Sequence, residues 1–251
     1  MNSLDFTCNC CGTSIVACPV EMIDREVPSC PTCQSTVRWR SIVHLLSVGL
    51  HGNSIPLPRW PVNKAIRGIG LSYWSGYADG LADKTNYTNT YFHTEPSFDV
   101  VAPRPDYINQ FDYLVSSEVF EHVVHPVSRA FDGARTILRS GGVFVFTVPF
   151  FDAPETVEHF PHLNAFKIIE IDGEHILVNK RQDGTIETHR DLVFHGGPGT
   201  TLEMRMFCRT DVINHLRQAG FVDITVMDQD VPEYGIIHKH SWGLPIFARV
   251  P

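Results

Sequence analysis

The residues of this sequence with the clearest chemical pattern are its cysteines. Six of the seven lie in the first 33 residues of a 251-residue chain. Cys8 and Cys11 form one C-x-x-C pair, and Cys30 and Cys33 form a second. Two such pairs can give four thiolates to one tetrahedral Zn²⁺, and four sulfurs leave no open position for catalysis. The spacing therefore predicts a structural zinc site with these four ligands.

Two further cysteines leave other ligand sets open. Cys10 can replace Cys8 or Cys11, and so can Cys18, although only Cys8 and Cys11 have the x-x spacing. The alternative to zinc is a reduced, metal-free tail. Disulfides are not expected, because the N-terminus has no secretory signal pattern. A module this short has little core of its own, so bound zinc is expected to supply much of its folding energy.

A second group of residues, between positions 151 and 207, is suited to proton transfer. It contains His159, His162 and His195, with Glu203 as a partner that can orient an imidazole. Histidine has an unperturbed pKa of about 6.5 and therefore suits general-base catalysis near neutral pH. The alternative is catalysis by positioning alone. The adjacent HGGPG segment, 195–199, is predicted to be either an anion-binding nest or a plain tight turn.

These residues need a scaffold, and the pattern over 111–150 indicates an α/β sheet. Residues 112–115 are predicted to form a buried strand, with Ser116, Ser117 and Glu118 at its carboxyl end. An amphipathic segment, a Gly-Gly turn at 141–142 and a second apolar strand follow. Together with the short strand and glycine turn near Gly68 and Gly70, this order predicts a doubly wound sheet, in which ligands bind at the carboxyl ends of the strands.

The same residues resemble the class I S-adenosylmethionine-dependent methyltransferases of the small-molecule type. FDYLVSSEVFEHV and RTILRSGGVFVFTVPF carry the resemblance, which covers residues 63–151. It resumes over 208–227, where Leu216, Ala219, Gly220 and Phe221 match L-x-x-A-G-F. GIGLS is similar to the family's glycine turn, with Ile66 where an acidic residue is usual. The resemblance implies a Rossmann-like methyltransferase sheet and S-adenosylmethionine as cofactor.

The resemblance also implies where the cofactor is bound. A ribose-binding acid is expected about 20 residues after the glycine turn, but 86–92 contains none, so Asn89 and Glu95 are the candidates for its place. Asp99 is expected on the adenine side. Ser116 and Ser117 are expected in the pocket wall, and a packing role is the alternative for His122 and its neighbour Glu121. The full set of implied cofactor contacts is Gly68, Gly70, Ser72, Asn89, Glu95, Asp99, Ser116, Ser117, Glu118 and His122.

Composition limits the class of partner. The formal net charge is −8, which argues against a broad nucleic-acid footprint, and the short basic run at 38–40 does not reverse it. The sequence has no apolar run of about 20 residues that could span a membrane. A cytoplasmic protein with a small-molecule partner is therefore expected, while the oligomeric state is left open.

The domain organisation follows from these signals. We expect a zinc-binding module at 1–40, a helix and linker at 41–62, and the methyltransferase domain at 63–251. Within that domain, 151–207 is a β-rich insertion expected to act as a substrate lid. Three functions are consistent with this plan: O- or N-methylation of a small molecule, RNA methylation, and a non-catalytic zinc-ribbon scaffold on a degenerate core. The methyl acceptor, and uses of the cofactor other than methyl transfer, stay open.

Overall fold

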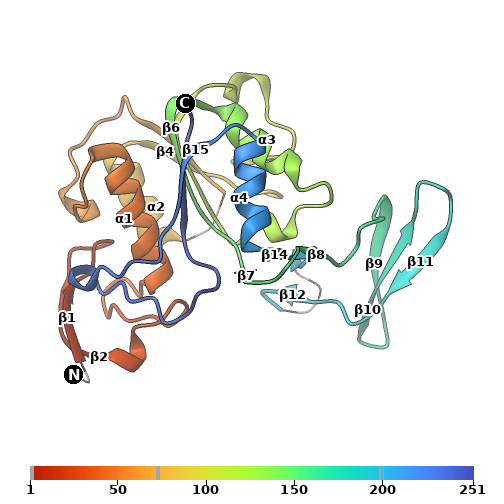
Figure 1. Cartoon of the computed structure of the whole chain (residues 1–251), viewed down its shortest axis with the longest axis horizontal. Coiled ribbons are helices and arrows are strands. Elements are labelled where there is room, and N and C mark those ends of the chain that lie inside the picture. Colours follow the sequence, from red (N-terminus) through yellow and green to blue (C-terminus); the bar gives the residue numbers. More distant parts are fainter. Residues whose placement is uncertain (1–2, 72–73, 198, 200) are drawn as a thin grey trace.

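The architecture is a central sheet with helices on both faces, seen in a computed structural model that describes residues 3–71, 74–197, 199 and 201–251 (Figure 1). Among these residues the sheet has six strands, in the order β15 (Val222–Val226), β16 (Ile246–Arg249), β6 (Leu138–Thr147), β5 (Phe111–Ser117), β3 (Arg67–Gly70) and β4 (Asn86–Asn89). Strands β4, β3, β5 and β6 run parallel, whereas β16 is antiparallel to both of its neighbours. The predicted Rossmann-like α/β fold is thereby confirmed.

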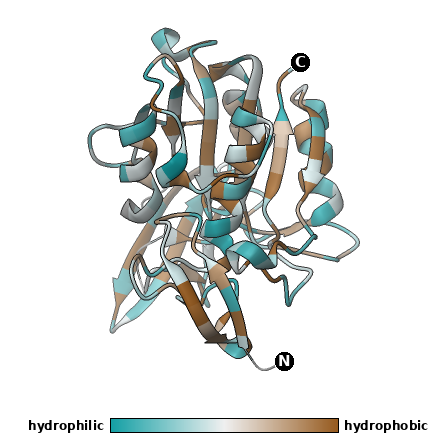
Figure 2. Cartoon of the chain, turned by 90° about the vertical axis from the view of Figure 1, so that its left-hand side faces the viewer, coloured by the Kyte–Doolittle hydropathy of each residue, from teal (hydrophilic) through white to brown (hydrophobic). Residues whose placement is uncertain are grey.

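The central strand β5 is buried along its whole length, because helices cover the sheet on both sides. Its side chains alternate between two cores: Tyr113 and Val115 join one, and Leu114 joins the other. Figure 2 shows apolar strands between helices of mixed hydropathy. Each fully buried side chain of this size contributes roughly 1.5–3 kcal/mol.

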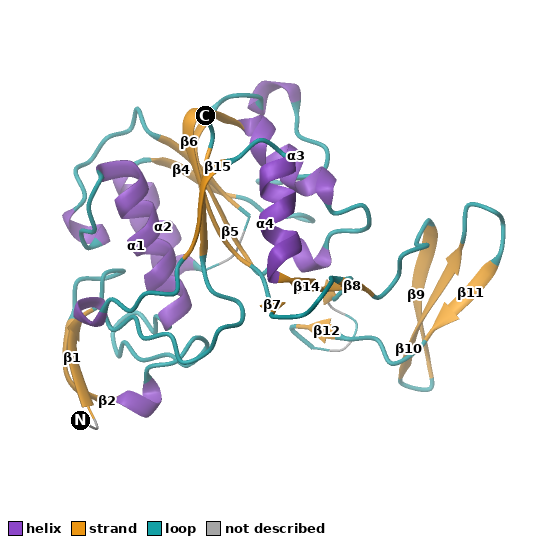
Figure 3. Ribbon diagram, in the orientation of Figure 1, coloured by secondary structure: helices purple, strands orange, loops and turns teal. Residues whose placement is uncertain are grey.

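The helices divide between the two faces of the sheet. Figure 3 shows α1 (Val37–His51) and α2 (Ser75–Lys84) on one side, and α3 (Ser128–Ile137) and α4 (Arg209–Gln218) on the other. Helix α1 ends at Gly52, whose φ of 76° is the left-handed conformation common after a helix C-terminus. Among the described helices, none is both long and apolar enough to cross a bilayer. The short 3-10 helices are η1 (Val20–Met22), η2 (Leu57–Arg59), η3 (Pro105–Tyr107), η4 (Phe120–His122) and η5 (Pro232–Tyr234).

The N-terminal segment packs against this body and shares one of its cores. Strands β1 (Ser3–Thr7) and β2 (Ser14–Pro19) form an antiparallel hairpin. Side chains from it, including Phe6, lie in the same cluster as Leu46 of α1 and Tyr77 of α2. This core continues across residues 40 and 62 and does not mark a boundary at either position. The expected domain boundaries there stay predictions.

The insertion between β6 and α4 is β-rich. It contains β7 (Phe150–Phe151), β8 (Val157–Glu158), β9 (Ala165–Ile171), β10 (Glu174–Lys180), β11 (Ile186–His189), β12 (Phe194–His195), β13 (Thr201–Leu202) and β14 (Arg205–Cys208). Strands β9, β10 and β11 form an antiparallel sheet that projects from the body (Figure 1). Strand β14 pairs with β7 and β8 and returns the chain to α4. Only the base of the insertion therefore lies near the central sheet.

The topology fixes where a ligand is expected. The chain runs from β3 outward to β4 and then crosses back to β5 on the other side of β3. Such a reversal opens a crevice at the carboxyl ends of the strands, where open α/β sheets bind their ligands. The residues at these ends are Gly70, Asn89, Ser117 and Thr147.

Candidate functional site

The carboxyl end of β5 carries polar side chains in a buried setting. Ser117 Oγ and Thr147 Oγ1 lie 3.0 Å apart across β5 and β6. The Ser116 hydroxyl is buried and has no hydrogen-bond partner in the described part of the chain. Glu118 then adopts a positive φ of 54°, and its amide donates to the Thr147 carbonyl at 2.9 Å. An unpaired hydroxyl at the switch point of the sheet is a fitting contact for a bound polar ligand.

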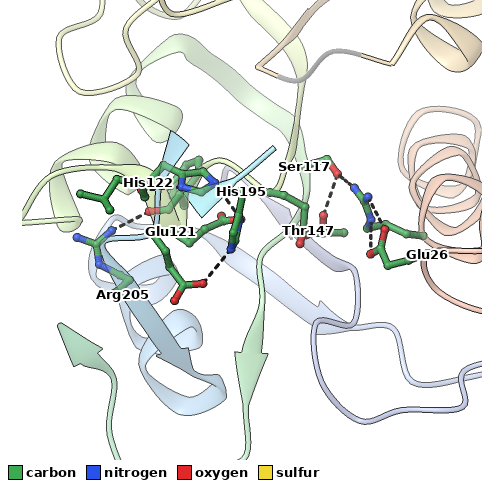
Figure 4. A network of polar contacts seen from close by, with 12 residues as sticks. Glu26, Ser117, Glu121, His122, Thr147, His195 and Arg205 are labelled. Atoms are coloured by element: carbon green, nitrogen blue, oxygen red, sulfur yellow. Dashed lines mark hydrogen bonds and ion pairs between the residues drawn. The ribbon is translucent and has the colours of Figure 1, made fainter. Parts of the chain in front are cut away.

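Two arginines from the N-terminal segment reach this strand end. Arg25 Nη2 donates to Glu118 Oε1 at 2.8 Å. Arg38 donates to Ser117 Oγ, which lies beside Thr147 in Figure 4. Arg38 is also paired with Glu26 at 2.7 Å. Burial alone would raise the pKa of Glu118, but the charges of Arg25 and Arg38 outweigh it and hold that pKa below its ordinary value. Sequence reasoning missed both arginines, since nothing in the spacing links residues 25 and 38 to position 118.

The glycines of β3 are explained by neighbouring tyrosines. A Cβ at Gly68 would overlap the Tyr113 ring, and one at Gly70 would overlap the Tyr87 hydroxyl. The two tyrosine rings stack with centroids 5.9 Å apart. Glycine at these positions therefore makes room for aromatic packing, which differs from the expected approach of a ligand to the backbone. Ser72, the next expected contact, lies outside the described residues.

The three candidates for the ribose and adenine contacts have different surroundings. Asn89 ends β4 beside Gly70, and its Oδ1 accepts from the Tyr87 hydroxyl at 3.2 Å. Glu95 is exposed and accepts from the amide and hydroxyl of Ser97, both at 2.9 Å. Asp99 accepts from the Val101 amide at 2.9 Å. The Asn89 amide is thus placed at the strand end, while both carboxylates hold local turns.

Directly after β5, the helix η4 carries a buried carboxylate beside two imidazoles. Glu121 is 0% exposed, and in the described structure neither of its oxygens has a hydrogen-bond partner. His122 Nε2 lies 3.6 Å and His195 Nδ1 lies 3.9 Å from Glu121 Oε1. The two rings meet edge to face with centroids 4.7 Å apart (Figure 4). Burial raises the pKa of Glu121 well above its ordinary value and lowers the pKa of His122.

Glu203 joins this group to the insertion. Its carboxylate accepts from His195 Nε2 at 3.0 Å and from His159 Nε2 at 2.9 Å. The structure therefore brings together three of the four residues expected to be catalytic. His162 is not among them, since its carbonyl is bonded to Asn179 at the base of the projecting sheet.

Buried bonds fix the insertion to η4 at this point. Arg205, 1% exposed, is paired with Glu158 at 2.7 Å and donates to the Phe120 carbonyl at 2.8 Å. The Met204 amide donates to the Glu121 carbonyl at 2.8 Å. These bonds hold the base of the insertion, with its side chains, against η4.

The N-terminal cysteines form a separate cluster. The Sγ atoms of Cys8 and Cys33 lie 3.6 Å apart, as do those of Cys11 and Cys30, and all four lie within 4.8 Å of one another. A tetrahedron with Zn–S bonds of about 2.3 Å has sulfurs roughly 3.8 Å apart. A disulfide would need about 2.05 Å. The four thiols therefore fit a zinc ion.

A buried cation lies beside this cluster. Arg40 is 0% exposed and bonds to the Ser35 carbonyl, the Ser29 hydroxyl and the Gly235 carbonyl at 2.8–2.9 Å. Ser35 Oγ lies 3.1 Å from Cys8 Sγ. Burial lowers the pKa of Arg40, while the nearby cysteines oppose that shift. Four thiolates around Zn²⁺ carry a net charge of −2, which would neutralise this guanidinium.

Comparison with known proteins finds one family match and similar solved structures. Residues 82–146 match a family model described as a methyltransferase domain. The sugar N-methyltransferase KedS8 from Streptoalloteichus is 10% identical with a TM-score of 0.47, covering 85% of this chain and 86% of its own. An S-adenosylmethionine-dependent methyltransferase from Clostridium acetobutylicum is 12% identical with a TM-score of 0.43, covering 74% and 84%. The comparison with curated proteins gives no significant match.

The family match spans the segment that runs from the end of α2 through β4 and β5 into β6. This segment contains the strand ends at Asn89 and Ser117, and the η4 residues that follow them. Over residues 82–146, therefore, the chain is similar to a methyltransferase domain.

Proposed function

We propose that this enzyme methylates an oxygen or nitrogen atom of a small-molecule acceptor. The observation that carries the proposal is the histidine–glutamate cluster at the carboxyl end of β5. It lies next to the strand end where the cofactor is expected, and the base of the insertion completes it. The net charge of −8 supports a small acceptor over RNA.

S-adenosylmethionine, when bound, supplies a methyl group activated by a positively charged sulfur. The residues proposed to hold it are those at the strand ends. The Asn89 amide suits ribose hydroxyls, and the unpaired Ser116 hydroxyl offers a further polar contact. Glu118 and Arg38 carry opposite charges, which suit the ammonium and carboxylate of the amino-acid end.

The acceptor must lose a proton as it is methylated, and the cluster offers groups for this. Glu203 orients the imidazoles of His159 and His195 through Nε2. A histidine held by a carboxylate is a competent base near neutral pH. Positioning of the acceptor contributes the larger part of the lowering of the activation barrier, up to roughly 7–11 kcal/mol in ideal cases.

We also propose that Cys8, Cys11, Cys30 and Cys33 bind a structural zinc ion. The sulfur spacing and the buried charge of Arg40 support it. The ion would fix the N-terminal segment that carries Arg25 and Arg38 to the strand end.

The test is cofactor binding followed by methyl transfer. Calorimetry should detect S-adenosylmethionine, and Asn89→Ala should bind it more weakly than the control Asn164→Ala in the insertion. Label from the methyl-tritiated cofactor should then appear in hydroxyl- or amine-bearing small molecules. No binding at millimolar cofactor would refute the enzyme proposal. Label appearing in RNA alone would refute the small-molecule acceptor and identify RNA as the acceptor.

A further inference from the structure

The starting point is the Glu121 carboxylate. It is fully buried, and neither oxygen meets a hydrogen-bond donor among the described side chains and backbone groups. Burying an unpaired carboxylate costs several kcal/mol, so buried charges are normally paired or coordinate a metal. The nearest groups with ligating atoms are the imidazoles of His122 and His195, which η4 and β12 bring to it. A bound cation would pair the buried carboxylate.

The two imidazoles are held so that their ligating nitrogens face this carboxylate. His122 Nδ1 is 2.9 Å from the Leu202 carbonyl, and His195 Nε2 is 3.0 Å from Glu203. Both partners are acceptors, so those nitrogens carry the hydrogens. His122 Nε2 and His195 Nδ1 then present lone pairs toward Glu121. Metal-binding histidines are typically oriented in this way, by a carbonyl or carboxylate on the opposite nitrogen.

The distances agree with one shared ion. The ligand atoms of Glu121, His122 and His195 lie within 4.8 Å of one another. Ligands at about 2.0–2.2 Å from a metal lie roughly 3–4 Å apart, which brackets the 3.6 and 3.9 Å separations. Two imidazoles with one carboxylate suit Mn²⁺, Fe²⁺, Co²⁺ or Zn²⁺ better than Ca²⁺ or Mg²⁺.

We propose that Glu121, His122 and His195 bind one divalent transition-metal ion. The site differs from the cysteine cluster because three protein ligands leave coordination positions open. The metal site itself does not depend on the acceptor.

The role of the ion rests on the proposed function. An open position would take a hydroxyl oxygen of the acceptor, and the positive charge would lower the pKa of that hydroxyl. The proton leaves to solvent or to the His159–Glu203 pair. The oxygen forms a bond to the methyl carbon as the carbon–sulfur bond breaks, and the sulfur keeps the electron pair. The acceptor is therefore an alcohol or phenol, and the enzyme is an O-methyltransferase.

The first experiment measures metal binding with Mn²⁺ as the probe. The full chain is given one equivalent of Zn²⁺, which the four thiolates take first, and is then titrated with Mn²⁺ by electron paramagnetic resonance. One Mn²⁺ per chain is expected. Glu121→Gln and His195→Ala should each weaken binding by more than about tenfold, and Glu203→Gln by roughly 10–100-fold. The matched control Glu170→Gln, an exposed glutamate 3.8 Å from His175, should bind as the native chain does.

Two results would overturn the proposal. One is that the zinc-loaded chain binds no Mn²⁺, and the other is that Glu121→Gln and the native chain bind Mn²⁺ with equal affinity. Misfolding is controlled by thermal unfolding without Mn²⁺. Glu121→Gln keeps the shape of the side chain and removes a buried charge, so it should unfold at the native temperature or higher. Added Mn²⁺ should raise that temperature in the native chain and raise it less in Glu121→Gln.

A second experiment separates the metal site from the proposed function. Methyl transfer to a phenol is measured with and without Mn²⁺. One outcome is that the native chain binds Mn²⁺, Glu121→Gln abolishes this binding, and no acceptor is methylated. This outcome would refute the proposed function and support the metal site. Methyl transfer at the native rate in Glu121→Gln without Mn²⁺ would keep the function and overturn the ion's role.

Discussion

The role of Gly70 is open to a direct test, because packing and ligand binding predict different results. Gly70 ends β3, and a Cβ there would overlap the Tyr87 hydroxyl and lie 2.9 Å from both Tyr87 Cζ and Asn89 Oδ1. The Tyr87 ring is 8% exposed and stacks on Tyr113, so it has little room to move. We expect Gly70→Ala to lower the free energy of unfolding by about 1–3 kcal/mol, the usual cost of overpacking a core.

The magnitude can be traced to one atom. Tyr87→Phe removes the overlapping oxygen and, by itself, costs about 0.5–1.5 kcal/mol for the lost bond to Asn89. In the double variant the worst overlap is gone, so the two effects should not add, with a coupling of about 1 kcal/mol or more. Urea unfolding of the four proteins at fixed zinc concentration measures it. Tyr107→Phe is the control, and its effect should add to that of Gly70→Ala.

Two outcomes would refute this reasoning. Additive effects of Gly70→Ala and Tyr87→Phe would show that the hydroxyl is not what the new methyl group meets. Native stability of Gly70→Ala combined with weaker S-adenosylmethionine binding would mean that the glycine serves the ligand and not the tyrosine.

Three further predictions concern the charged and metal-binding groups. Cys30 lies in the same core as α1, so Cys30→Ser or zinc chelation should lower the melting temperature of the whole chain by several degrees in scanning calorimetry; an unchanged transition would contradict this. Arg40→Met leaves the thiolates without their buried cation and should weaken zinc binding about tenfold against a competing chelator, whereas equal affinity would separate Arg40 from the site. The pKa of Glu118 is lowered in the folded state, since Arg25 and Arg38, which are both also paired with Glu26, outweigh its burial. Its stabilisation is thus present above the unfolded pKa of about 4.3 and lost as pH falls through the lower folded value, so the stability gap to Glu118→Gln in urea unfolding should close below pH 4; a constant gap would refute this.

Sequence patterns predicted those features that depend on neighbouring residues. The apolar run ending at Ser117 identified β5, because strand burial shows directly in residue type. The two C-x-x-C pairs identified the thiols that the structure brings together, since each pair is local. The parallel sheet then confirmed the Rossmann-like α/β fold, and residues 82–146 match a methyltransferase domain.

Features that depend on contacts distant in sequence were not predictable. The side chains that fill the space beside Gly68 and Gly70 come from β5 and β4, so the pattern of one strand cannot show them. Arg25 reaches Glu118 across 93 residues. Of the three candidate histidines, only those next to Glu203 in space join the cluster, and the spacing of His162 carried no sign of its different position.

Residues 117–122 are where the N-terminal segment and the insertion meet the central sheet. The N-terminal segment contributes Arg25 and Arg38 to the first half, and the insertion contributes His195 and Glu203 to the second. In the proposed enzyme the first half faces the cofactor and the second half the acceptor. Changes in the insertion should therefore alter acceptor choice while leaving cofactor affinity in place. Loss of zinc should do the reverse, because it releases the arginines from the strand end and leaves Glu203 bonded to its histidines.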